Sequence, residues 1–93
     1  MIYNVICEIS DANTAGNFEA RLKAICKETC QYASNAWFVD FDGERKDIFS
    51  SLRESLTEND TLVVSNIDFN NMAGWLPGNV IDWIKKKIQT NDK

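Results

Sequence analysis

The order of strand-like and helix-like segments constrains the fold of this chain more than any other feature. Short apolar or aromatic segments predict strands at 2–9, 29–33, 36–41 and 61–67. Helical spacing predicts one helix that begins at a cap on Asn17 and a second that contains Ile48, Leu52 and Leu56. The polar residues 10–16 predict a turn before the first helix. This order predicts an α+β fold, the ferredoxin-like βαββαβ arrangement of four antiparallel strands.

Both faces of the predicted sheet carry apolar side chains. Tyr3 and Val5 alternate with Ile6 along the first strand, and Trp37 alternates with Phe38 on the strand expected beside it. Two helices cover one face only, so the other face requires either the C-terminal segment or a second subunit. A chain of 93 residues also buries only roughly 60–65% of the surface that its unfolded form exposes, so its stability as a monomer is expected to be marginal. Dimerisation is therefore expected.

The C-terminal segment 72–88 predicts a third helix added to the ferredoxin-like unit, within one domain that spans 1–93. Val80, Ile84 and Ile88 recur at helical spacing, and the lysine run 85–87 lies where the helix dipole favours cations and is expected to be solvated. Tryptophans near an apolar helix face are usually core or interface residues, and the other reading is a platform for stacked bases. The predicted interface residues are Ile6, Phe38, Trp75 and Trp83.

Composition excludes several classes of chemistry. The chain has no histidine, so it cannot build a Ser/His/Asp triad, a Cys/His pair or a histidine-bearing zinc site. Its three cysteines, Cys7, Cys26 and Cys30, are too few for a four-thiolate zinc site and are expected to be small apolar fillers in a reducing compartment. The four glycines are scattered and form no phosphate-binding loop. Any catalysis would rest on carboxylates with a divalent cation.

Charge and hydropathy limit the partners. The net charge is −4 with ten basic residues, which does not favour nucleic acid as a partner. No apolar run approaches the length of a membrane span, and no positive flank precedes the first apolar segment. We therefore expect an acidic, cytoplasmic protein that does not bind membranes.

Four stretches of the chain resemble a known family. The opening "YNVICEIS", then "SNAWFVDF", "SLTENDTLVV" and "AGWLPGNVIDWIKKK", are similar to the SinR-like proteins. These are small relatives of the CRISPR-associated Cas-two family and of virulence-associated protein D. The resemblance covers most of the chain and includes no catalytic signature. It implies a ferredoxin-like protomer that forms a homodimer.

The resemblance also implies a candidate catalytic and metal site. In the nuclease-like relatives, an aspartate at the end of the first strand lies near its symmetry mate and is thought to hold a divalent metal at a phosphodiester. Glu8 occupies that position here, so the chain carries the longer carboxylate. Asp11 in the adjoining loop and Asp60 before the last strand are the candidate supporting ligands for Mg²⁺ or Mn²⁺.

Three functions follow as expectations. The first is a homodimeric module that binds a protein partner. The second is a metal-dependent endoribonuclease or deoxyribonuclease centred on Glu8. The third is an acidic inhibitor of a nucleic-acid-binding protein, whose carboxylates imitate phosphates.

Overall fold

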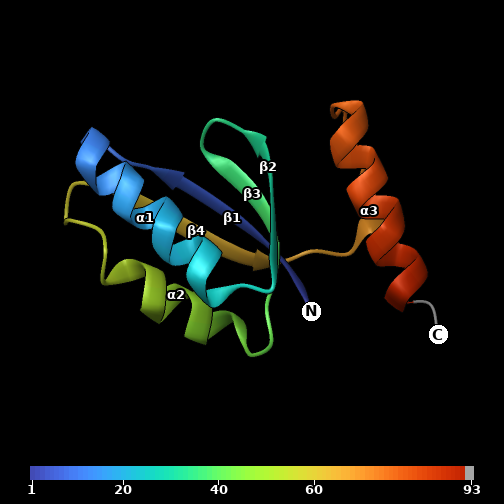
Figure 1. Cartoon of the computed structure of the whole chain (residues 1–93), viewed down its shortest axis with the longest axis horizontal. Coiled ribbons are helices and arrows are strands. Elements are labelled where there is room, and N and C mark those ends of the chain that lie inside the picture. The colour runs from blue at the N-terminus through green and yellow to red at the C-terminus, as the bar shows by residue number, and fades with distance from the viewer. Residues whose placement is uncertain (92–93) are drawn as a thin grey trace.

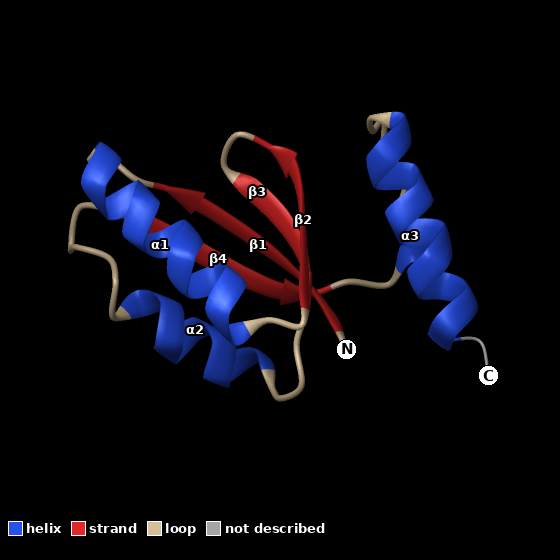
Figure 2. Cartoon of the chain, in the orientation of Figure 1, coloured by secondary structure: helices blue, strands red, loops and turns tan. Residues whose placement is uncertain are grey.

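The computed structural model describes residues 1–91 and contains four strands and three α-helices (Figures 1 and 2). The elements in chain order are β1 (Ile2–Glu8), α1 (Ala12–Ile25), β2 (Glu28–Ala33), β3 (Ala36–Asp40), α2 (Arg45–Arg53), β4 (Thr61–Asn66), the short 3-10 helix η1 (Phe69–Asn71) and α3 (Gly78–Asn91). The four predicted strands and the added C-terminal helix are confirmed.

The four strands form one sheet in the order β2-β3-β1-β4. Each neighbouring pair is antiparallel, and β1 and β3 lie side by side at the centre. The turn at Ser34 and Asn35 joins β2 to β3, and a bulge between Gln31 and Ala33 shifts their register. The predicted α+β, ferredoxin-like arrangement is confirmed.

One face of the sheet is covered by α1 and α2, and we call it the first face. Alternate residues of β1 and β3 point to it and form the main core with the inward stripes of the two helices. Its buried members are Tyr3, Val5, Cys7, Phe18, Leu22, Cys26, Trp37, Val39, Ile48 and Leu52. The predicted alternation along the central strands is therefore confirmed.

The opposite face, which we call the second face, is covered over only part of its width. Figure 1 shows α3 on the other side of the sheet from α1 and α2. Val80 of α3 is buried against Cys30 of β2 and Phe38 of β3, and side chains from the connection between β4 and α3 join them. This cover rests on β2 and β3, and it leaves the β1 and β4 side of the second face open around Ile6 and Val63.

The helix boundaries differ from those predicted. Helix α1 begins at Ala12, because the Asp11 carboxylate accepts the Thr14 N–H at 2.9 Å and caps the helix six residues before the cap predicted at Asn17. The turn predicted over 10–16 was wrong from Ala12 onward, since a good cap outweighs the weak propensity of polar residues. Helix α2 ends at Arg53, so Leu56 packs on the core from beyond its end.

None of the helices in the part of the chain that the structure describes is both long and apolar enough to span a bilayer.

Candidate functional site

Glu8 is the last residue of β1, and its side chain is exposed on the second face. It pairs in register with Thr61 of β4, and it lies two residues along the same face from Ile6. The strand-end position predicted for this carboxylate is therefore the position that it occupies.

Asp11 and Asp60 use their carboxylates to hold backbone. Asp11 Oδ2 caps α1, while Asp60 Oδ2 accepts the Thr57 N–H at 2.8 Å. Asp60 Oδ1 accepts the Ser10 N–H at 3.2 Å, which ties the loop after β1 to the turn before β4. The Thr57 hydrogen bond, with smaller contributions from Ser10, lowers the pKa of Asp60 from its ordinary value against the opposing effect of desolvation. Both aspartates thus have structural roles at the end of the sheet where Glu8 lies.

The three predicted ligands do not form a metal centre within one chain. Among residues 1–91, no group of three His, Cys, Asp or Glu side chains is placed so that it could hold a metal ion. Glu8 therefore offers a divalent cation one carboxylate per chain, whereas Mg²⁺ requires an octahedral oxygen shell. A metal site here would need a second protomer, the substrate or several waters to complete it.

The three cysteines offer no activated nucleophile. Cys7, Cys26 and Cys30 are buried and free, as the sequence predicted for apolar fillers. Burial raises the thiol pKa of each, and in Cys26 burial together with the charge of Asp40 raises it to about 11. A high pKa keeps a thiol protonated and unreactive at neutral pH.

A groove of about 460 Å³ lies where the start of β1 meets α3 and the connection before it. Its lining residues are Met1, Ile2, Ile67, Asp68, Phe69, Asn70 and Ile88. The one carboxylate in the lining, that of Asp68, accepts the Asn70 N–H at 2.9 Å and caps η1. The groove therefore lacks the converging polar groups of a small-molecule site.

The open part of the second face carries an apolar cross-strand pair. Ile6 of β1 and Val63 of β4 lie directly opposite each other, and they are 37% and 56% exposed. Their neighbours on this face are polar, with Asn4 and Ser65 in one direction and Glu8 in the other. Of the other predicted interface residues, Trp75 is fully exposed in the connection to α3.

Phe38 and Trp83, also predicted at a subunit interface, lie instead in the second core cluster of the same chain. Phe38 is 3% exposed, and its ring stacks on Tyr32 with centroids 4.2 Å apart and meets Phe69 edge-on at 5.2 Å. Trp83 is half-buried against the same cluster. The prediction that Phe38 is available to a second subunit was wrong, because α3 folds back over β2 and β3 and covers it.

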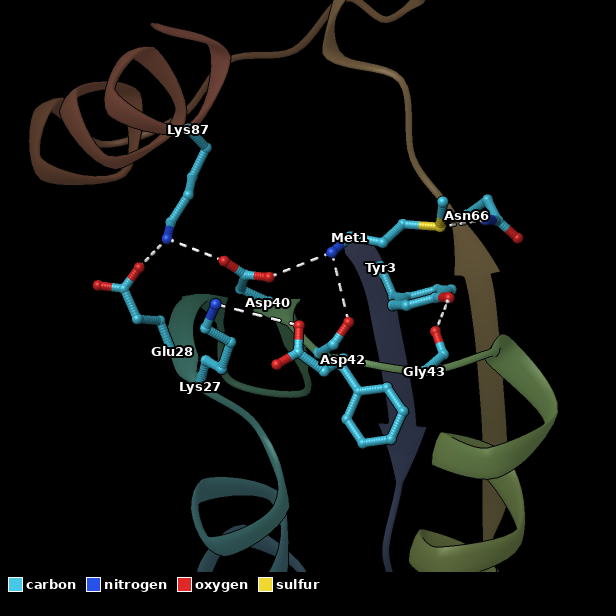
Figure 3. Close-up of polar contacts among 10 residues, drawn as sticks. Met1, Tyr3, Lys27, Glu28, Asp40, Asp42, Gly43, Asn66 and Lys87 are labelled. Carbon is cyan, nitrogen blue, oxygen red and sulfur yellow. Dashed lines mark hydrogen bonds and ion pairs between the residues drawn. The ribbon is translucent and has the colours of Figure 1, made fainter. Parts of the chain in front are cut away.

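A charged cluster joins α3 to the sheet (Figure 3). Lys87 Nζ pairs with Glu28 and lies 3.1 Å from Asp40 Oδ2, while the amine of Met1 lies 3.3 Å from Asp40 Oδ1. The Trp83 ring lies 5.3 Å from the same ammonium. Desolvation, followed by the charge of Lys27, lowers the pKa of Lys87, whereas the neighbouring carboxylates favour its charged form.

The ion pairs of Lys87 were not predicted from the sequence, because we expected the whole lysine run to be solvated. The signal that could have identified them is the position of Lys87 seven residues after Val80, on the stripe that also contains Trp83 and Ile84. A lysine at the end of an apolar helix stripe can bury its aliphatic stem and reach a carboxylate at the rim.

Comparisons with known proteins support the fold alone. No family model matches the sequence, and no curated protein matches it. Among solved structures, the chain is similar to the hypothetical protein TT1823 from Thermus thermophilus, with a TM-score of 0.59 and 20% sequence identity. The similarity covers 82% of this chain and 93% of that protein.

Proposed function

We propose that this protein is an interaction module that forms a homodimer at the open β1 and β4 side of its sheet. The observation that carries the proposal is the exposed pair of Ile6 and Val63. Ile6 belongs to a central strand, and central strands of small sheets are normally covered on both faces when both carry apolar residues. The chain's own third helix covers β2 and β3 and leaves this pair exposed.

The surroundings of the pair suit an interface better than an active site. Apolar residues in the middle with polar residues around them are the usual anatomy of a protein contact. The polar neighbours Asn4, Glu8 and Ser65 would form such a rim. The resemblance to SinR-like proteins, which implies a homodimer, supports the same proposal.

Replacement of Val63 by Lys tests the proposal. A lysine at the centre of the contact places two like charges in an apolar interface, so we expect the dimer to dissociate at tens of micromolar. Light scattering measures the mass, and circular dichroism checks that the fold is retained. Ile81→Lys is the matched control, since Ile81 is 39% exposed on α3. Unchanged association of Val63→Lys, or equal loss in the control, would contradict the proposal.

A metal-dependent nuclease centred on Glu8 is the second candidate. Glu8 lies two residues from Ile6 on the same face, so a dimer formed by stacking this face on its mate would bring the two Glu8 carboxylates toward each other. Two carboxylates could then share Mg²⁺ or Mn²⁺ and orient a water at a phosphodiester. The implied role of the matching aspartate in the nuclease-like relatives supports this candidate.

The Glu8→Gln variant separates the two candidates. For the interaction module we expect no cleavage of single- or double-stranded RNA or DNA with Mg²⁺ or Mn²⁺. We also expect the variant to change stability by less than about 0.5 kcal/mol, as at ordinary surface sites. Metal-dependent cleavage that Glu8→Gln abolishes and Glu8→Asp retains would promote the nuclease. Protein from independent purifications controls for contaminating nucleases.

A further inference from the structure

The outer edge of β4 is an unpaired sheet edge. In the order β2-β3-β1-β4 this strand pairs with β1 alone. The Cys7 N–H donates to the Asn35 carbonyl on the β3 side, so the odd-numbered backbone groups of β1 face β3 and the even-numbered groups face β4. Thr61, Val63 and Ser65 pair with even-numbered residues of β1, so their backbone N–H and C=O groups point toward β1. The backbone N–H and C=O groups of Leu62, Val64 and Asn66 therefore point outward.

Nothing in β4 itself protects this edge. The strand Thr61–Asn66 contains no charged residue, proline or bulge, which are the usual devices against edge pairing. The other edge, β2, has a bulge between Gln31 and Ala33 and carries α3 through the Lys87 ion pair. Within residues 1–91, no partner for the outward backbone groups of β4 is found among the hydrogen bonds. An unprotected edge beside an exposed apolar side chain indicates a strand partner.

We propose that the β4 edges of two copies pair antiparallel about a two-fold axis at Val63, which joins the two four-stranded sheets into one. The inference rests on the proposed homodimer and makes it a side-by-side dimer, in which the second faces of the two copies are not stacked on each other. Val63 of one copy lies opposite Val63 of the other, and Leu62 exchanges backbone hydrogen bonds with Val64 of the other copy. On the second face, Ile6 and Val63 of both copies form one continuous apolar row.

Charge favours this register over the neighbouring one centred on Val64. Only the outward-pointing backbone groups of the even-numbered residues can form hydrogen bonds between the two β4 strands. The two-fold axis can therefore pass through an odd-numbered residue, midway between two hydrogen-bonded pairs, or through an even-numbered residue, which then pairs with its own mate. An axis at Val63 places Asp60 of one copy opposite Asn66 of the other. The Asn66 Oδ1 atom accepts a hydrogen bond from Arg45 Nη1 at 2.7 Å, so this axis brings a guanidinium and a carboxylate of different copies near each other. An axis at Val64 would place Asp60 opposite Asp68, and like charges directly opposite are destabilising.

The helix beside the edge adds apolar surface on the first face. Arg45 reaches Asn66 of β4, so this side of α2 faces the strand edge. Phe49 lies four residues later on the same side of the helix and is exposed. Edge pairing brings the two α2 helices near each other on one sheet face, where the two Phe49 rings would be covered.

Hydrogen exchange of the full chain, followed residue by residue by NMR, tests the proposal. The amides of Thr61, Val63 and Ser65 bond to β1 in every state and are the internal control. We expect the Leu62 and Val64 amides to exchange roughly tenfold more slowly once about nine chains in ten are dimeric, because exchange then requires free chains. Fast exchange at both in a proven dimer would overturn the edge geometry and leave the proposed function standing. A monomer at all concentrations would overturn both.

A charge change at the rim gives a second readout. Arg45→Glu places a carboxylate of one copy near Asp60 of the other copy. We therefore expect the dimerisation affinity to weaken roughly three- to tenfold at low salt and less at high salt. Lys46→Glu makes the same charge change at an exposed neighbour that pairs with Glu44, and it is expected to leave the affinity within about twofold. Equal effects of the two variants would overturn the register.

Discussion

Removal of the chain after Gly74 is expected to lower the free energy of unfolding by at least about 3 kcal/mol. The truncation deletes α3, whose Val80 is buried against Cys30 and Phe38. Burial of one large aliphatic or aromatic side chain contributes roughly 1.5–3 kcal/mol, and a small domain has roughly 5–10 kcal/mol in total. Urea unfolding followed by far-UV circular dichroism measures the change.

The matched control for the truncation is Trp75→Ser. Trp75 is fully exposed, so its loss removes a large aromatic residue from the same segment without uncovering the sheet. We expect the unfolding midpoint of this variant to stay close to that of the parent protein. A truncated chain with an unchanged midpoint would show that α3 does not cover the second face.

The Phe38→Ala variant is expected to lose about 3–5 kcal/mol of stability at every protein concentration. Phe38 is 3% exposed between Tyr32 and Phe69, and deletion of a buried phenylalanine leaves a cavity that the structure refills only in part. Thermal and urea unfolding at two concentrations measure the effect.

Ile6→Ala is the control for Phe38→Ala, since Ile6 lies on the adjacent strand and the same face but is open to solvent. We expect it to cost less than about 1.5 kcal/mol in the monomer. If Phe38→Ala weakened association and left the monomer stability unchanged, Phe38 would be an interface residue after all.

The sheet was predictable because its local signals agree. Val5 and Ile6 point to opposite faces as the alternation requires, and the Ser34 and Asn35 turn falls between two strands. The order of the elements then left the ferredoxin-like arrangement as the simplest topology. The start of α1 was not predictable from periodicity, because the turn from Ala12 onward buries no large apolar side chain and is fixed by the Asp11 cap.

The candidate site was predicted in part. The sequence placed Glu8 at the end of a strand, but it gave no indication that Asp11 and Asp60 are bound to backbone N–H groups. It also left open which cover the second face takes. The cover depends on how the connection after β4 positions α3 against the sheet. The residue types at Phe38 and Trp83 do not reveal this long-range contact.

We expect the protein to associate with itself through an interface that contains Val63. Sedimentation velocity of the full chain at tens of micromolar tests it most directly. We predict one species with twice the mass of the chain, which dissociates on dilution and is lost in Val63→Lys but not in Ile81→Lys. A single species with the mass of one chain across the whole concentration range would show that the protein does not associate through Val63.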